Sequence, residues 1–127
     1  MFSHIMIGAN DGATSRRFYD AVLGALGIPP GVVDDQGRTI YATPTGMFMI
    51  TQPINGQPAT AANGGTIGFR ASTPEAVDAW HAAGLANGGV TCEDPPGVRE
   101  GNYGKLYLGY LRDPAGNKIC ALHRVRA

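Results

Sequence analysis

The sequence predicts an α+β fold in which two copies of one βαβββ module form a single domain. The first observation is a repeat, because the second half follows the pattern of the first when Thr66 is placed on His4. In this alignment Trp80 falls on Phe18. The second observation is the order of patterns within each half: an apolar run, a segment of helical periodicity, then short apolar runs. One such module leaves a sheet face uncovered, so we expect two to form an eight-stranded, open, barrel-like sheet with a central cavity and the helices outside.

The length and charge of the chain limit its class. Its 127 residues suffice for one domain, 1–127, with module 1 at about 1–55, a linker at about 53–63 and module 2 at about 64–127. Ten basic residues balance ten acidic ones, which gives no electrostatic footprint for nucleic acid or an anionic membrane. The sequence has no apolar run of bilayer-spanning length and no secretory signal pattern. We therefore expect a cytoplasmic protein whose partners include neither nucleic acid nor membrane.

The first module begins with a buried strand over residues 2–9. Apolar residues then recur at every fourth position from Phe18, which predicts a helix from about residue 13 to residue 26. Asp11 or Thr14 is suited to cap the start of this helix, and a glycine follows its end. Short strands separated by turn residues are expected at 32–33, 38–42 and 47–51.

The second module repeats this order from a strand at 66–69. A Ser-Thr-Pro-Glu run at 72–75 is a strong helix start, with a hydroxyl cap, proline in the first turn and Glu placed for a capping box. The buried face of this helix is expected to consist of Val77, Trp80 and Gly84. Strands are expected at 90–93 and 105–112, with a loop at 94–97 between them.

The most distinctive stretch runs from Asp113 to Cys120 and reads Asp-Pro-Ala-Gly-Asn-Lys-Ile-Cys. Pro fixes φ at the second turn position, Asp hydrogen-bonds its own backbone, and Gly adopts positive φ freely. The stretch therefore predicts a β-hairpin that closes the sheet, with Cys120 just inside the returning strand.

Four features together resemble the vicinal oxygen chelate (VOC) superfamily, which includes glyoxalase I, bleomycin-resistance proteins and extradiol dioxygenases. They are a first strand with an early His, an Asp before the helix, Phe-Tyr inside that helix, and the distal Asp-Pro-x-Gly-Asn-Lys-Ile hairpin. The resemblance covers nearly the whole chain. It implies the same cavity-forming architecture, a homodimer, and a small organic molecule as the partner.

The resemblance also implies where a metal would bind. Metalloenzymes of the superfamily hold one divalent ion with donors from the first and last strands of each half, usually His and Glu or Gln. The first donor position is His4, and two others fall on Thr66 and Cys120. The remaining donor would come from 47–52, which has no His or carboxylate, so that only Gln52 could coordinate there in a shifted register. Catalytic zinc sites usually keep three protein ligands. We therefore expect a degenerate metal site and a protein without a cofactor. The alternative is that a divalent Zn, Ni, Fe or Mn ion binds to a non-standard set of ligands.

His4 and Cys120 are the candidate catalytic residues, because the family donors at these positions touch the same ion. A thiol beside an imidazole ionises below its usual pKa and becomes nucleophilic. The alternatives are that His4 is a hydrogen-bonded wall residue and that Cys120 is a small buried apolar residue.

Strand alternation predicts the rest of the ligand-binding set. Met6 shares the face of His4, and Gly68 shares the face of Thr66. Further candidates near the cavity, whose facing the sequence leaves open, are Phe48, Met49, Tyr103 and Tyr107. Such residues suit an adaptable amphipathic ligand and suit a plain core about equally well.

Three functions remain open at this point. The first is a glyoxalase/bleomycin-resistance-like protein that binds or transforms a small organic molecule. The second is a non-catalytic protein that sequesters such a molecule. The third is an active metal-dependent lyase or dioxygenase with non-standard ligands.

Overall fold

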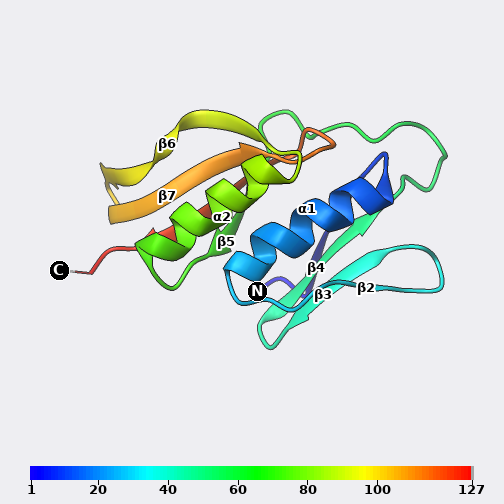
Figure 1. The fold of residues 1–127 in the computed structure, drawn as a ribbon, viewed down its shortest axis with the longest axis horizontal. Helices are drawn as coiled ribbons and strands as arrows, with labels where there is room; N and C mark the ends of the chain where they lie inside the picture. The colour runs from blue at the N-terminus through cyan, green and yellow to red at the C-terminus, as the bar shows by residue number, and fades with distance from the viewer. Residues whose placement is uncertain (127) are drawn as a thin grey trace.

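The computed structural model describes residues 1–126 and contains two βαβββ modules in chain order (Figure 1). Module 1 comprises β1 (His4–Gly8), α1 (Gly12–Ala25), β2 (Val32–Val33), β3 (Thr39–Thr43) and β4 (Gly46–Thr51). Module 2 comprises β5 (Ile67–Arg70), α2 (Pro74–Ala86), β6 (Val90–Gly101), β7 (Gly104–Arg112) and β8 (Lys118–Arg124). The domain predicted from the sequence ends at residue 127, which lies outside the described residues.

The eight strands form two four-stranded sheets with the same internal order, β1-β4-β3-β2 and β5-β8-β7-β6. In each sheet the first strand of the module pairs in parallel with the last, so that His4 lies opposite Met47 and Gly68 opposite Cys120. The α+β class and the duplicated module are confirmed. The strands form two open sheets instead of one because β1 and β5 each pair with one strand only.

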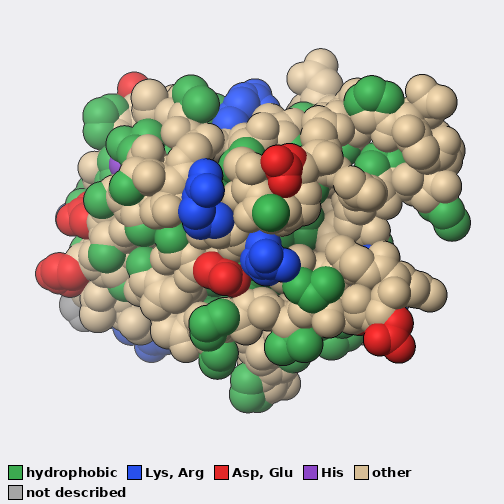
Figure 2. Space-filling view, turned by 45° about the vertical axis from the view of Figure 1, so that its right-hand side comes forward, with side chains coloured by type: hydrophobic (Ala, Val, Ile, Leu, Met, Phe, Trp, Pro, Cys, Tyr) green, Lys and Arg blue, Asp and Glu red, His purple; other side chains and the backbone are tan. Residues whose placement is uncertain are grey.

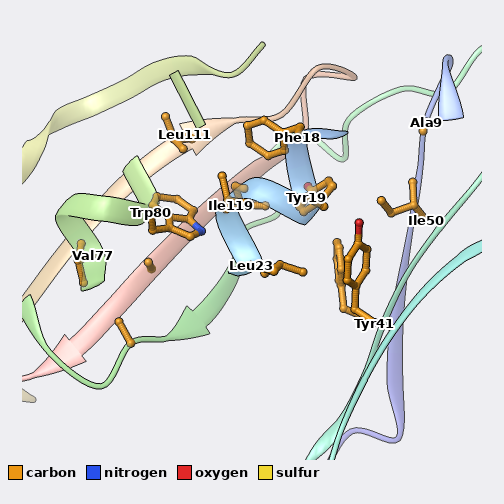
Figure 3. Packing of buried hydrophobic residues seen from close by; sticks show 14 residues of the cluster. Ala9, Phe18, Tyr19, Leu23, Tyr41, Ile50, Val77, Trp80, Leu111 and Ile119 are labelled. Atoms are coloured by element: carbon orange, nitrogen blue, oxygen red, sulfur yellow. The ribbon is translucent and has the colours of Figure 1, made fainter. Parts of the chain in front are cut away.

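The two helices lie side by side in front of the sheets (Figure 1). The buried residues of α2 are the predicted Val77, Trp80 and Gly84, and those of α1 are Ser15, Phe18, Tyr19, Val22 and Leu23. In Figure 3, α1 lies between Trp80 and Ile119 on one side and Tyr41 and Ile50 on the other. One hydrophobic core therefore runs through both modules and fixes their mutual position.

Side-chain caps start both helices where the sequence indicates. The Asp11 carboxylate accepts hydrogen bonds from the backbone N–H of Ala13 at 3.1 Å and of Thr14 at 3.2 Å. These N–H groups, with Thr14 first, lower the pKa of Asp11. The Thr73 hydroxyl accepts a bond from the N–H of Ala76 at 3.1 Å. Both caps satisfy backbone donors that would otherwise lack a partner at a helix start.

β6 departs from the predicted elements. The loop predicted at 94–97 lies inside β6, which runs continuously to Gly101. The pairing with β7 shifts register between Cys92 and Gly97, and Glu93 has a φ of 59°. Two prolines in this stretch cannot donate to the ladder, so the strand accommodates them as a β-bulge and resumes pairing beyond it.

The predicted hairpin turn after β7 also joins the two modules. One Asp113 oxygen accepts from the N–H of Ala115 and of Asn117, each at 2.9 Å. The other oxygen accepts from the Tyr19 hydroxyl of α1 at 2.6 Å and from the Asn117 amide at 2.9 Å. The Asn117 amide also donates to the carbonyl of Gly8 at the end of β1, at 3.1 Å. The turn thus holds the helix and the first strand of module 1.

The molecular surface carries interspersed charges. Figure 2 shows acidic and basic side chains mixed on one face, without a large field of one sign. Neither helix in the described part of the chain has the length and apolar character that crossing a membrane requires.

Candidate functional site

A hollow lies between the free edges of β1 and β5 and forms a groove between the modules. Its volume is about 500 Å³. His4 and Ile5 of β1 line one flank, and the whole of β5, residues 67–70, lines the other. The start of β4 at 46–48 and the C-terminal end of α1 with Leu26 complete the walls. The site therefore exists because each module leaves its first strand unpaired on one side.

The walls of this inter-module groove are mainly apolar and aromatic. Phe48 and Phe69 meet edge to face, with ring centroids 5.1 Å apart, and so bring β4 and β5 together. Tyr41 also lines the groove, and its hydroxyl donates to an Asp20 carboxylate oxygen at 2.8 Å. Burial, together with this hydrogen bond, raises the pKa of the Tyr41 hydroxyl. Tyr41 is therefore a neutral, anchored wall residue.

Apart from the neutral Tyr41, the ionisable side chains along the groove are those of His4 and Arg70. His4 lines the β1 flank, and its Nδ1 lies 2.8 Å from the Ser3 hydroxyl oxygen. Arg70 lines the β5 flank. Neither Asp nor Glu is found among the described residues that line the groove. The groove thus offers hydrogen-bond donors and a positive charge beside apolar walls.

The structure brings three of the predicted site residues to this groove, namely His4, Phe48 and Gly68. Met6 and Met49 face each other in the β1–β4 register and lie on the sheet face that carries His4. Met6 is 39% exposed, whereas Met49 is buried. These two methionines do not belong to the groove lining.

Three other predicted residues lie away from the groove. Thr66 is exposed and precedes β5. Tyr103 is 81% exposed in the turn between β6 and β7. Tyr107 lies on the helix side of its sheet, where its hydroxyl donates to Asp78 of α2 at 2.7 Å. Tyr107 therefore serves the contact between strand and helix.

Cys120 lies beside Gly68 in the β5–β8 register and is not among the residues that line the groove. A Cβ added at Gly68 would stand 3.1 Å from the Cys120 sulfur, so the absence of a side chain at Gly68 leaves room for the thiol. Burial raises the pKa of Cys120 to about 11, with a smaller lowering by Lys118 and a raising by Glu93. His4 is not among these causes. Cys120 at this site is a protonated, inert thiol at neutral pH.

The side chains at the family's metal positions do not fit a metal ion in this chain. Among residues 1–126, no group of three or more His, Cys, Asp or Glu side chains could hold one. The His4 ring is hydrogen-bonded to the Ser3 hydroxyl, Thr66 is exposed outside the groove, and the Cys120 thiol is protonated. A metal needs deprotonated ligands that converge. These three side chains therefore do not form a converging set of metal ligands.

Sequence reasoning missed Arg70 and Phe69, which contribute the charge and the aromatic wall of the β5 flank. The repeat does contain a signal for Phe69, because it aligns with Ile7 on the helix-facing side of β1. No comparable signal exists for Arg70. Its role depends on the position of one module relative to the other, which strand alternation does not supply.

The topology and the groove define a two-module α+β protein with a ligand-sized hollow between the edges of its modules. The chain belongs to the Glyoxalase/Bleomycin resistance protein/Dioxygenase superfamily, whose sequence model matches residues 1–121. The resemblance seen in the sequence is thereby confirmed. Among curated proteins, none matches this chain.

Solved structures with the same fold include a glyoxalase/bleomycin resistance protein from Albidiferax ferrireducens T118. It is 65% identical, with a TM-score of 0.95 over 98% of this chain and 99% of that chain. A lactoylglutathione lyase from Agrobacterium tumefaciens is 22% identical, with a TM-score of 0.66 over 97% of this chain and 92% of that chain. At that identity the second likeness shows the fold alone.

Proposed function

We propose that this protein binds a small organic molecule in the inter-module groove and does so without a metal ion. The observation that carries the proposal is the groove itself, whose volume of about 500 Å³ suits a ligand of small-molecule size. Its walls are mainly apolar, with a few polar groups from His4 and Arg70. This composition is typical of binding sites in which apolar burial supplies affinity and a few polar contacts fix orientation.

Two further features favour sequestration over catalysis. Burial keeps the Cys120 thiol protonated, so it does not supply a nucleophile. His4 contacts Ser3, and no carboxylate orients its ring among the contacts of the described residues. In catalytic triads a carboxylate at this position holds the imidazole and stabilises its protonated form. Binding alone requires neither group to react.

Filling the groove tests this proposal. Ile67→Trp places a large ring on the β5 flank, whereas Val98→Trp adds the same ring on β6, where Val98 is 53% exposed and outside the groove. We expect small aromatic compounds to raise the melting temperature of the native protein and of the Val98 variant, but not of the Ile67 variant. Equal stabilisation of both variants would contradict binding in the groove.

Metal analysis of the purified protein addresses the alternative function. Stoichiometric zinc, nickel, iron or manganese would favour a metal-dependent lyase or dioxygenase with non-standard ligands. The homodimer implied by the family resemblance stays a prediction, which gel filtration with light scattering would test. The cytoplasmic location stays a prediction as well.

A further inference from the structure

The inter-module groove has basic side chains and, among its described lining, no acidic ones. His4 contributes from β1 and Arg70 from β5, so the two basic side chains lie on opposite flanks. The described lining contains no carboxylate that would neutralise the Arg70 guanidinium. In the whole protein, by contrast, acidic and basic residues are equal in number. The positive character is therefore a property of the groove and not of the chain.

Arg70 has no fixed partner within residues 1–126. No ion pair or side-chain hydrogen bond involves its guanidinium there, although other arginines are engaged. Arg38 pairs with Asp34, and Arg112 and Arg124 donate to the backbone carbonyls of Gly116 and Tyr103. A free guanidinium presents a planar fork of donors that matches carboxylate, sulfonate or phosphate oxygens. Arg70 thus retains its full capacity to bind an anion.

Apolar surface adjoins this charge. Phe69 precedes Arg70 in β5 and points toward Phe48, with which it forms the edge-to-face pair. Alternation along the strand places Gly68 and Arg70 on the other face, and all of these residues line the groove. Because β5 is an edge strand, a ligand at its free edge can reach the aromatic rings on one face and the guanidinium on the other.

We infer that the ligand of this protein is an amphipathic organic anion, with an apolar, ring-sized body in the groove and one anionic group at Arg70. This inference rests on the proposed function, because it names the ligand class for the same groove. The apolar body supplies affinity by burial, and the guanidinium selects anions over neutral molecules of the same shape. A cationic ligand is disfavoured because no acidic side chain lines the described part of the groove.

Two fluorescent probes with one shared ring system test the inference. Anilinonaphthalene sulfonate carries an anionic group, and N-phenylnaphthylamine is its neutral counterpart. We expect the native protein to bind the sulfonate about tenfold more tightly than the neutral probe, the size of one charge-assisted contact. Arg70→Gln should remove this preference, and Arg70→Lys should retain part of it. Arg17→Gln, which removes an exposed charge outside the groove, should leave the preference intact.

Each outcome bears on a different claim. Both probes must lose binding in Ile67→Trp, and sulfonate binding that survives this variant would overturn the inference. Equal affinity for the two probes, unchanged in Arg70→Gln, would also overturn it while leaving small-molecule binding in place. Binding of neither probe would contradict the proposed function together with the inference. Thermal melts of every variant establish that the chain remains folded.

Discussion

The Tyr19→Phe substitution should destabilise the protein by removing one hydroxyl between its modules. The Tyr19 hydroxyl donates to Asp113 at 2.6 Å, and the two side chains are 0% and 3% exposed. Burial and the neighbouring Asp113 carboxylate raise the pKa of Tyr19, so the hydroxyl is a permanent donor at neutral pH. The substitution keeps the ring, whose centroid lies 4.9 Å from that of Phe18 and 4.8 Å from that of Phe48. The change is therefore confined to one hydrogen bond.

The remaining contacts of Asp113 determine how much stability Tyr19→Phe should lose. Its carboxylate keeps the two backbone N–H groups of Ala115 and Asn117 and the Asn117 amide. A hydrogen bond to a charged group contributes roughly 1.5–3 kcal/mol, and a carboxylate that retains three donors falls in the lower part of this range. We expect a loss of about 2 kcal/mol in the free energy of unfolding. For a chain of this length that loss lowers the melting temperature by about 7 °C.

Urea unfolding followed by circular dichroism measures this loss. Tyr103→Phe is the matched control, because Tyr103 is 81% exposed and its hydroxyl has no hydrogen-bond partner among the described residues. The control should change stability by less than about 0.5 kcal/mol. If the Tyr19 variant lost no more than the control, Asp113 would not couple the modules through Tyr19. A double substitution with Asp113→Asn should then also show no coupling.

Three other predictions concern packing, pH and capping. Gly84→Ala should lower the free energy of unfolding by about 1–3 kcal/mol, because the added Cβ would stand 2.3 Å from Leu111 Cδ1. Gly24→Ala should instead raise it by about 0.5–1 kcal/mol, because an added Cβ there meets nothing within 4 Å. Urea titrations of the two variants measure both changes. The raised pKa of Cys120 means that the folded state holds this proton more tightly than the unfolded state. Its contribution is complete below pH 9.0 and is lost as the pH rises to about 11. Native protein should therefore lose on the order of 2 kcal/mol more than Cys120→Ala across that window, and parallel slopes in chemical denaturation would refute the protonated thiol. Asp11→Ala should cost about 1 kcal/mol in thermal melts by removing the cap of α1, and an unchanged melting temperature would show that the cap contributes nothing.

The sequence was sufficient to predict the local elements and their duplication. Helix caps and turns can be predicted from a few neighbouring residues because they depend on short-range hydrogen bonds, as at Asp11, Thr73 and the Asp113 turn. The buried face of α2 follows from apolar spacing for the same reason, whereas α1 also buries Tyr19 and Leu23, which a four-residue spacing from Phe18 does not mark. Local patterns of this kind determine the helix starts and the hairpin turn.

The candidate site was predicted less completely because it depends on how the modules meet. Strand alternation correctly gave His4 and Met6 a common face, but it did not indicate that β1 and β5 would form the flanks of a groove. Tyr107 illustrates the limit, since its partner Asp78 lies on a helix that strand patterns do not place. The β-bulge in β6 was missed because proline and glycine at 94–97 are signals for a loop and for an irregular strand alike.

The order in which Asp113 acquires its partners bears on synthesis of the chain. Tyr19 leaves the ribosome long before Asp113, so a nascent module 1 lacks the acceptor for its tyrosine hydroxyl and the amide that reaches Gly8. A buried hydroxyl without a partner is costly, which favours solvent-exposed or incompletely packed states of α1 at that stage. Final consolidation of the N-terminal half should therefore wait until the last strand has emerged, and a fragment ending in the linker should remain loosely structured.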